Sequence, residues 1–369
     1  MNIRRVKAIA RKECLHVIRD PRSLMAALGM PILLLALFGY ALSLDVDHVQ
    51  TAVYDQSQTA ASRDLIQKFR GSRYFEVRDA PSYEAIESGI IRNQVLLGVV
   101  IPHDYARNTH LGKDVEVQLL IDGSDSNSAS IALGYAQALV RDHAIELQGQ
   151  AKVVMPIETR VRTWYNSDLK SRNYIVPGLI AVILMIIASQ LTSLTIAKEW
   201  ENGTMEQLLS TPVRPFEMLL GKLSAYFVLG IFDMLLALVI GVFVLGTPFR
   251  GSIVLLFAGG CLFLIGALTF GLLLSAATRN QNMAYLVATL TSFLPSFLLS
   301  GFMYSIETMP RFVQAITYAI PARYFVTILK GIFLKGVGLN VLWGQFLFLA
   351  LYATVVCAVA TRKMRQKMA

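Results

Sequence analysis

Long runs without a charged residue constrain this chain more than any other feature. Residues 23–44, 174–197 and 252–278 contain no Asp, Glu, Lys or Arg. About 18 apolar residues are enough to cross the hydrocarbon core of a bilayer as a helix, so each run predicts a transmembrane helix. Of all 369 residues, 54% are hydrophobic and only 16% are charged. The sequence therefore predicts a helical membrane protein that crosses the bilayer several times.

The positive charge of the chain lies outside one large polar insert. Residues 45–172 hold 14 Lys and Arg against 17 Asp and Glu, a net charge of −3, whereas the rest of the chain carries +12. Basic residues beside spans are typical of their cytoplasmic ends. The total charge of +9 therefore reflects membrane topology, and we expect no nucleic-acid partner.

Six spans give a topology that agrees with the charges. They are predicted at 23–44, 174–197, 223–246, 252–278, 283–304 and 341–361. Residues 1–22 and the basic tail 362–369 then both lie in the cytoplasm, and residues 45–172 lie outside it. The apolar run at 23–44 exceeds the 7–15 residues of a signal peptide core, which favours an uncleaved span.

Two further segments are predicted to meet the membrane without spanning it. Residues 3–19 have one apolar and one basic helical face, which favours an interfacial amphipathic helix over a simple basic flank. Residues 306–338 are apolar, but two prolines and several basic residues interrupt them. We expect two short re-entrant helices in the outer leaflet there, because a seventh span would move the basic C-terminus outside.

The insert at 45–172 is predicted to be an α/β domain. Extended apolar runs at 49–54, 74–77, 95–101, 115–121 and 157–164 read as strands, and helical patterns at 59–70, 82–92 and 126–150 fall between them. This alternation is typical of a strand layer covered by helices. The fold class predicted for the whole chain is thus a six-span α-helical membrane protein with an inserted extracytoplasmic α/β domain.

The sequence offers no catalytic or metal-binding motif. It lacks a phosphate-binding G-x-x-x-x-G-K-[ST] loop, G-x-S-x-G and H-E-x-x-H, and its three cysteines have no metal or disulfide spacing. We expect no enzyme activity, no metal and no cofactor in this chain. Asp233 is the one acid within a predicted span. It is a candidate functional carboxylate, and the alternative is that it bonds a neighbouring helix or reaches polar groups near the inner membrane interface.

A charged, helix-prone stretch separates two apolar runs at residues 198–212, KEWENGTMEQLLSTP, which we call the charged segment. Gly203 interrupts its helical pattern, and Thr204 is predicted to cap a second short helix with Gln207 at the third position. We expect Glu199 and Glu206 to share a face, beside an apolar patch of Met205, Leu208 and Leu209. The whole connection spans 198–222, longer than a capped connecting loop requires. It is predicted to be a docking element.

These residues resemble type 2 ABC transporter permeases. The resemblance rests on residues 199–208 (EWENGTMEQL), Thr211-Pro212, Glu217 and Gly221-Lys222, and it extends to Arg11-Lys12-Glu13, Arg19-Asp20-Pro21, and Leu299 to Phe302. It covers nearly the whole chain, and the insert is similar to that of bacterial multidrug-type members. The resemblance implies a permease subunit of the bacterial inner membrane that exports hydrophobic or amphipathic cargo.

The resemblance also implies partners and site residues. A separate ATPase subunit would bind ATP and Mg²⁺, a second permease chain, identical or paralogous, would complete the pore, and a periplasmic membrane-fusion adaptor would join them. Docking and coupling residues would be Glu199, Glu201, Gly203, Thr204, Met205, Glu206, Leu208 and Leu209. The second and fifth spans would line the path with Met185, Ile186, Phe293, Phe297 and Leu298, and Asp233 is added as a candidate.

Two other functions are compatible with the pattern. An ion-coupled secondary transporter would use Asp233 as its relay, but a single intramembrane acid and no visible inverted repeat speak against it. A membrane-anchored sensor or scaffold would act through the insert alone and leaves six spans without a role. Transport driven by ATP alone would distinguish the first alternative from an ABC permease.

Overall fold

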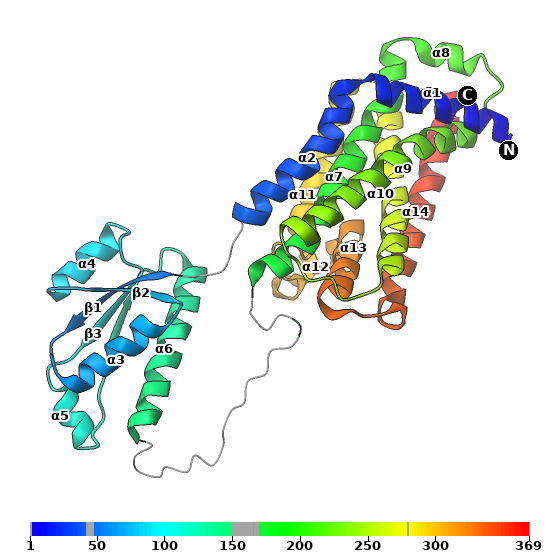
Figure 1. Cartoon of the computed structure of the whole chain (residues 1–369). Helices are drawn as coiled ribbons and strands as arrows, with labels where there is room; N and C mark the ends of the chain where they lie inside the picture. Colours follow the sequence, from blue (N-terminus) through cyan, green and yellow to red (C-terminus); the bar gives the residue numbers. More distant parts are fainter. Residues whose placement is uncertain (1, 42–47, 149–164, 166–169, 279, 369) are drawn as a thin grey trace. The chain divides into compact units, whose positions relative to one another are not determined.

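The computed structural model describes residues 2–41, 48–148, 165, 170–278 and 280–368. The chain divides into two compact units, Leu44–Arg162 and the combination of Met1–Ser43 with Thr163–Ala369 (Figure 1). The first unit is mixed α/β, and the second is helical. Each unit has its own hydrophobic core.

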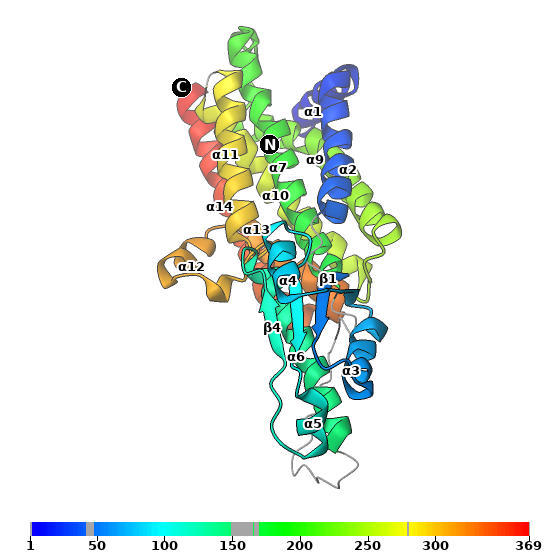
Figure 2. The same ribbon diagram turned by 90° about the vertical axis from the view of Figure 1, so that its left-hand side faces the viewer.

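The helical unit contains most of the chain. Its elements are α1 (Ile3–Arg19), α2 (Pro21–Ala41), α7 (Ser171–Glu201), α8 (Thr204–Leu209), α9 (Pro215–Val239) with a π-helical extension (Ile240–Val244), α10 (Ile253–Ala277), α11 (Gln281–Leu299), a 3-10 turn (Ile306–Thr308), α12 (Arg311–Thr317), α13 (Pro321–Lys330) with a π-helical turn (Gly331–Lys335), and α14 (Leu339–Met368). In both views α1, α8 and the last turns of α14 lie at one end of this unit (Figures 1 and 2).

Five helices in the described residues are long and apolar enough to cross a membrane, or six if one bent pair counts as a span. The five are α7, α9 with its extension, α10, α11 and α14. The predicted first span lies on α2, where the apolar helical stretch is the shorter Ala27–Tyr40, and residues 42–44 lie outside the described residues. The bent pair is α12 and α13 with its π-helical turn, bent by 86°. Two short helices were predicted there, and their depth in the membrane stays a prediction.

Helix α7 is the centre of the helical unit, with 83% of its apolar window buried inside the chain. Its closest neighbour is α10, because Gly271 leaves no side chain between the two backbones. The Thr192 hydroxyl donates to the Leu268 carbonyl across this contact at 2.9 Å. Ser275 Oγ accepts from the backbone amides of Ile196 and Ala197, each at 2.9 Å. The end of α7 is therefore fixed to α10 just before the charged segment begins.

The α/β unit consists of β1 (Val49–Asp55), α3 (Ala60–Gly71), β2 (Phe75–Asp79), α4 (Tyr83–Ile91), β3 (Leu97–Ile101), α5 (Tyr105–His110), β4 (Gln118–Ile121) and α6 (Ser126–Gln148). Its sheet has the order β2-β1-β3-β4, with β4 antiparallel to β3 and the other pairs parallel. Along β1, Val53 packs with α3 and α6 whereas Ala52 packs with α4, as strand alternation requires. The strand predicted at 157–164 lies outside the described residues.

Candidate functional site

The charged segment bends sharply where α7 ends. Asn202 follows the last helical residue, and Gly203 has a φ of 70°, the left-handed conformation that favours glycine at a helix end. Helix α8 then begins at Thr204, so Thr204 is not the cap that the sequence predicted. Its hydroxyl instead donates to the Glu199 carbonyl at 3.3 Å, back across the bend. Two helical pieces joined by a bend were predicted, and both are present.

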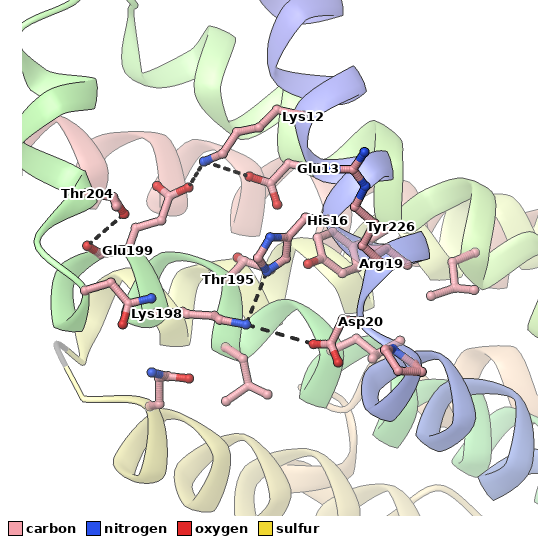
Figure 3. A pocket seen from close by; sticks show the side chains of 17 residues that line it. Lys12, Glu13, His16, Arg19, Asp20, Thr195, Lys198, Glu199, Thr204 and Tyr226 are labelled. Atoms are coloured by element: carbon pink, nitrogen blue, oxygen red, sulfur yellow. Dashed lines mark hydrogen bonds and ion pairs between the residues drawn. The ribbon is translucent and has the colours of Figure 1, made fainter.

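A cluster of three buried side chains and the half-exposed Lys12 anchors the charged segment. Lys222 on α9 is 1% exposed, and its Nζ donates to Glu13 Oε1 of α1 at 2.7 Å and to Glu199 Oε1 of α7 at 3.0 Å. Lys12 Nζ donates to the same oxygen of Glu199 at 2.6 Å (Figure 3). We call Lys12, Glu13, Glu199 and Lys222 the charge cluster. It connects three helices that are far apart in the sequence.

The partners of Lys12 decide its protonation. Burial alone would lower the pKa of Lys12, but its hydrogen bond to Glu199 and the negative charges of Glu199 and Glu13 outweigh burial and raise it. The ammonium form therefore persists at neutral pH. The formal charges of the four side chains then sum to zero, which is the condition under which buried charges are tolerated.

Helix α1 is fixed to the start of α9 at a second point. The Glu217 carboxylate, 2% exposed, accepts from the backbone amides of Asn2 at 2.6 Å and Arg214 at 3.2 Å. Gly221 lets Ile9 of α1 approach closely, since an added Cβ would lie 2.7 Å from the Ile9 side chain. Helix α1 therefore packs on α9 through Ile9, and its Val17 is buried in the same core, whereas its apolar residues Ile3 and Ile18 are exposed.

The charged segment also reaches the start of α11. The Glu201 carboxylate accepts from the backbone amide of Gln281 at 3.0 Å, which satisfies a donor in the first turn of that helix. Beside this contact, a cavity of ≈ 840 Å³ opens between α1, α7 and α9 (Figure 3). Lys198 Nζ lies there within 3.2 Å of His16 Nε2 and 3.9 Å of Asp20 Oδ2. Three helices, α1, α9 and α11, thus contact the segment directly.

The predicted docking residues divide into exposed and buried groups. Glu201, Gly203, Thr204 and Glu206 are exposed, and Leu208 is half-buried. Glu199 and Met205 are 7% and 2% exposed, which differs from the expectation that they face a partner. The reason is that Glu199 neutralises two lysines and that Met205 packs into the helical core. Glu199 and Glu206 do not share a face, because the bend at Gly203 separates them. The side chain of Leu209 is not among those that the structure describes.

The predicted path residues lie on three helices. Met185 and Ile186 are buried on α7, whereas Phe293 and Leu298 on α11 are 37% and 39% exposed. Phe297 packs against Phe38 of α2 at a ring distance of 6.3 Å. Asp233 on α9 is 1% exposed, and its Oδ1 has no hydrogen-bond partner among the described residues. Bonding of that oxygen to a neighbouring helix is therefore not seen.

Sequence reasoning missed the partners of Glu199. Lys12, Glu13 and Lys222 carry the resemblance to permeases, but no role was assigned to them. One signal was available: Lys222 directly precedes an apolar run, and a lysine that enters the core there requires acidic partners. Glu13 lies on the same helical face as the buried Ile9 and Val17 of α1, at spacings of four.

The comparisons define the class of this protein. A family model described as ABC-2 family transporter protein matches residues 21–362. The chain belongs to this family, and it is the multi-pass membrane permease component of an ABC transporter. It is 36% identical over 368 residues to the probable multidrug ABC transporter permease YbhS of Escherichia coli K12, covering 99% of this chain and 98% of the relative.

Two further relatives extend the comparison. The probable multidrug ABC transporter permease YbhR of the same organism is 32% identical over 365 residues, covering 98% of this chain and 99% of the relative. The inner membrane transport permease YhhJ is 26% identical over 322 residues, covering 85% and 84%. The similarity therefore includes the charged segment, the spans and the insert in one continuous match.

Proposed function

We propose that this permease exports hydrophobic or amphipathic molecules with energy from a separate ATPase subunit, and that the charged segment transmits movement between the two. The names of the multidrug permease relatives support the class of cargo. The observation that carries the coupling role is the charge cluster, because it joins the segment to α1 and α9 within the core. A short helix held in this way moves as one body with the spans.

The route of transmission follows from the contacts. The exposed residues of α8, with Glu206 and Gln207 among them, face outward for docking, and Met205 fixes α8 to the core. A push on α8 reaches α7 through the bend at Gly203. It reaches α9 through Lys222, and it reaches α11 through Glu201. Glu199 and Met205 thus act in coupling from inside the chain, and Glu201, Gly203, Thr204, Glu206, Leu208 and Leu209 form the docking side.

The path and the assembly are part of the same proposal. A second permease chain, identical or paralogous, completes the pore, and Met185, Ile186, Phe293, Phe297 and Leu298 line it with Asp233. The partner ATPase binds ATP and Mg²⁺, which agrees with the absence of a phosphate loop in the sequence. Both termini lie in the cytoplasm of a bacterium and residues 45–172 lie beyond the inner membrane, where they meet a periplasmic membrane-fusion adaptor.

Gentle detergent purification of the tagged full chain from its native membranes tests the docking role. We expect an ATP-binding subunit to co-purify with the parent chain. Glu206→Arg places a cation on the exposed side of α8 and should lower the recovery at least about tenfold. Glu307→Arg is the control, because it makes the same charge reversal at an exposed acid in the 3-10 turn. It should leave the recovery of the ATP-binding subunit unchanged. Recovery of the folded parent without any ATP-binding protein would refute the proposal.

A further inference from the structure

A groove on the outer surface of the helical unit is unrelated to the charged segment. It has a volume of ≈ 710 Å³ and lies between α10 and α14, beside the start of α9. On the α14 side the groove is lined by small residues at helical spacings of three and four, so they share one face of the helix. Leu262 and Ile265 of α10 line the opposite side. The residues of α14 are Ala350, Ala353, Thr354, Cys357, Ala358 and Thr361.

The lining of the groove is apolar along most of its length. Its two hydroxyl groups are turned back onto the helix, since Thr354 donates to the Ala350 carbonyl at 2.7 Å and Thr361 to the Cys357 carbonyl at 2.8 Å. Such bonds leave mainly methyl groups facing outward. The groove therefore provides no free hydroxyl donor and favours an apolar occupant along these turns.

One end of the groove is strongly basic. Arg362 and Arg365 line it there, three residues apart and hence on the same helical face. Both are exposed, and neither has an ion pair or hydrogen bond to any residue that the structure describes. Two guanidinium groups without acidic partners are suited to bidentate binding of a phosphate. No acidic side chain lines the groove, so the charge favours an anion.

The dimensions correspond to one leaflet of a bilayer. Ala350 and Arg365 are 15 residues apart, which at 1.5 Å per residue is about 22 Å along the helix. Half of a bilayer, including its headgroup region, measures roughly 20–22 Å. Arg362 and Arg365 belong to the last turns of α14 (Leu339–Met368), and these turns lie at the same end of the helical unit as α1 and α8 (Figure 1). A phosphate at the membrane surface would thus reach the arginines while its acyl chain follows the groove.

We propose that this groove binds an anionic phospholipid, with the phosphate against Arg362 and Arg365 and one acyl chain between α10 and α14. The proposal needs only a chain that resides in a membrane, so it is independent of the ATPase partner. A second copy of this chain, or free phosphate at the arginines alone, are the competing occupants.

Native mass spectrometry of the full chain, released from nanodiscs of phosphatidylglycerol or of phosphatidylcholine, tests the proposal. We expect retained phosphatidylglycerol on the parent chain and about tenfold weaker retention for Arg362→Gln and for Arg365→Gln, as loss of a charge-assisted contact predicts. Lys363→Gln removes one charge from the same helix end outside the groove, and it should retain the lipid. Equal loss in all three variants would mean nonspecific charge attraction and overturn the site.

A second pair of variants tests the apolar part without touching a charge. Ala358 is an exposed residue of the groove lining, so Ala358→Phe places a ring in the groove. Val359 is exposed but lies outside the groove, so Val359→Phe adds a ring of the same size on the neighbouring surface. Only the first should displace the lipid. Equal retention in both, retention unaffected by lipid class, or full competition by inorganic phosphate would each refute the proposal. A change from dimer to monomer in Ala358→Phe would assign the groove to a second copy instead.

Discussion

Lys222 Nζ lies 2.7 Å from Glu13 Oε1, although 209 positions separate the two residues in the sequence. Both residues are buried, Lys222 with 1% and Glu13 with 4% of its surface exposed. Contacts of this kind add little net stability when intact, but removing one partner leaves an uncompensated charge. Helix α1 and helix α9 are therefore required to stay together.

Lys222→Met should destabilise the helical unit by about 3–5 kcal/mol, because it leaves Glu13 without its closest cation and Glu199 with one lysine. Lys12→Met at the half-exposed lysine should cost less than about 1 kcal/mol. Thermal unfolding in detergent compares the two. Adding Glu13→Gln to Lys222→Met should restore part of the loss, and a strictly additive double variant would contradict the pairing.

Gly203→Val should separate ATP hydrolysis from transport while the chain still folds. A left-handed conformation costs a residue with a side chain roughly 1–2 kcal/mol, so valine will change the bend. Transport per ATP hydrolysed in reconstituted vesicles should fall. Gly134→Val lies in open space at an ordinary helical φ and is the matched control. Normal coupling in Gly203→Val would count against a role for the bend.

Gly271→Ala should weaken the contact between α7 and α10. An added Cβ would overlap Thr192 Oγ1 and the Ser189 carbonyl oxygen, both fixed within the core. We expect a loss of about 1–3 kcal/mol in stability, as overpacking of a core predicts. Gly344→Ala on α14, where the new methyl meets nothing within 4 Å, should be close to neutral. A thermal unfolding series with equal midpoints for both variants would disprove this contact.

Asp233→Asn should reduce transport if the buried carboxylate belongs to the path. The substitution keeps the size of the side chain and removes its ability to carry a negative charge. Export from vesicles, normalised to the amount of folded chain, measures the effect. Unchanged export would assign Asp233 a structural role only.

Acid should loosen the α/β unit. His143 is 3% exposed and its Nε2 lies 3.1 Å from the Tyr105 hydroxyl. Burial lowers the pKa of His143, although the charges of Asp64 and Glu146 oppose the shift. An unfolded chain then binds a proton more readily, so stability should be lost as pH falls below about 6.5. Hydrogen-exchange protection factors of α5 and α6 in the full chain, corrected for the intrinsic exchange rate at each pH, should fall between pH 7 and 5, and should fall less in His143→Gln.

The sequence predicted those features that depend on local pattern. Apolar runs located α7, α9, α10, α11 and α14, and turn residues located the bend at Gly203. The strands β1 to β4 followed from short extended apolar runs separated by helical patterns. These signals lie within a few residues of the structure they specify.

The charge cluster could not be predicted in this way. Glu199 read as an exposed docking acid because its neighbours in the sequence are polar, and only the fold brings Lys12 and Lys222 to it. Thr204 was predicted to be a helix cap for a similar reason. In the structure Gly203 holds the cap position of α8, and the Thr204 hydroxyl donates to the Glu199 carbonyl instead. Pairings over long sequence separations depend on helix packing, which a single sequence does not encode in any local pattern.

The charge cluster has an electrical consequence. Moving one elementary charge through a membrane potential of 100 mV changes the free energy by about 2.3 kcal/mol. A coupling element with a net charge would gain or lose free energy of this size when it moved across the field. Two lysines and two glutamates that move together carry no net charge. The voltage across the membrane therefore performs no net work on the charge cluster when it moves as one unit.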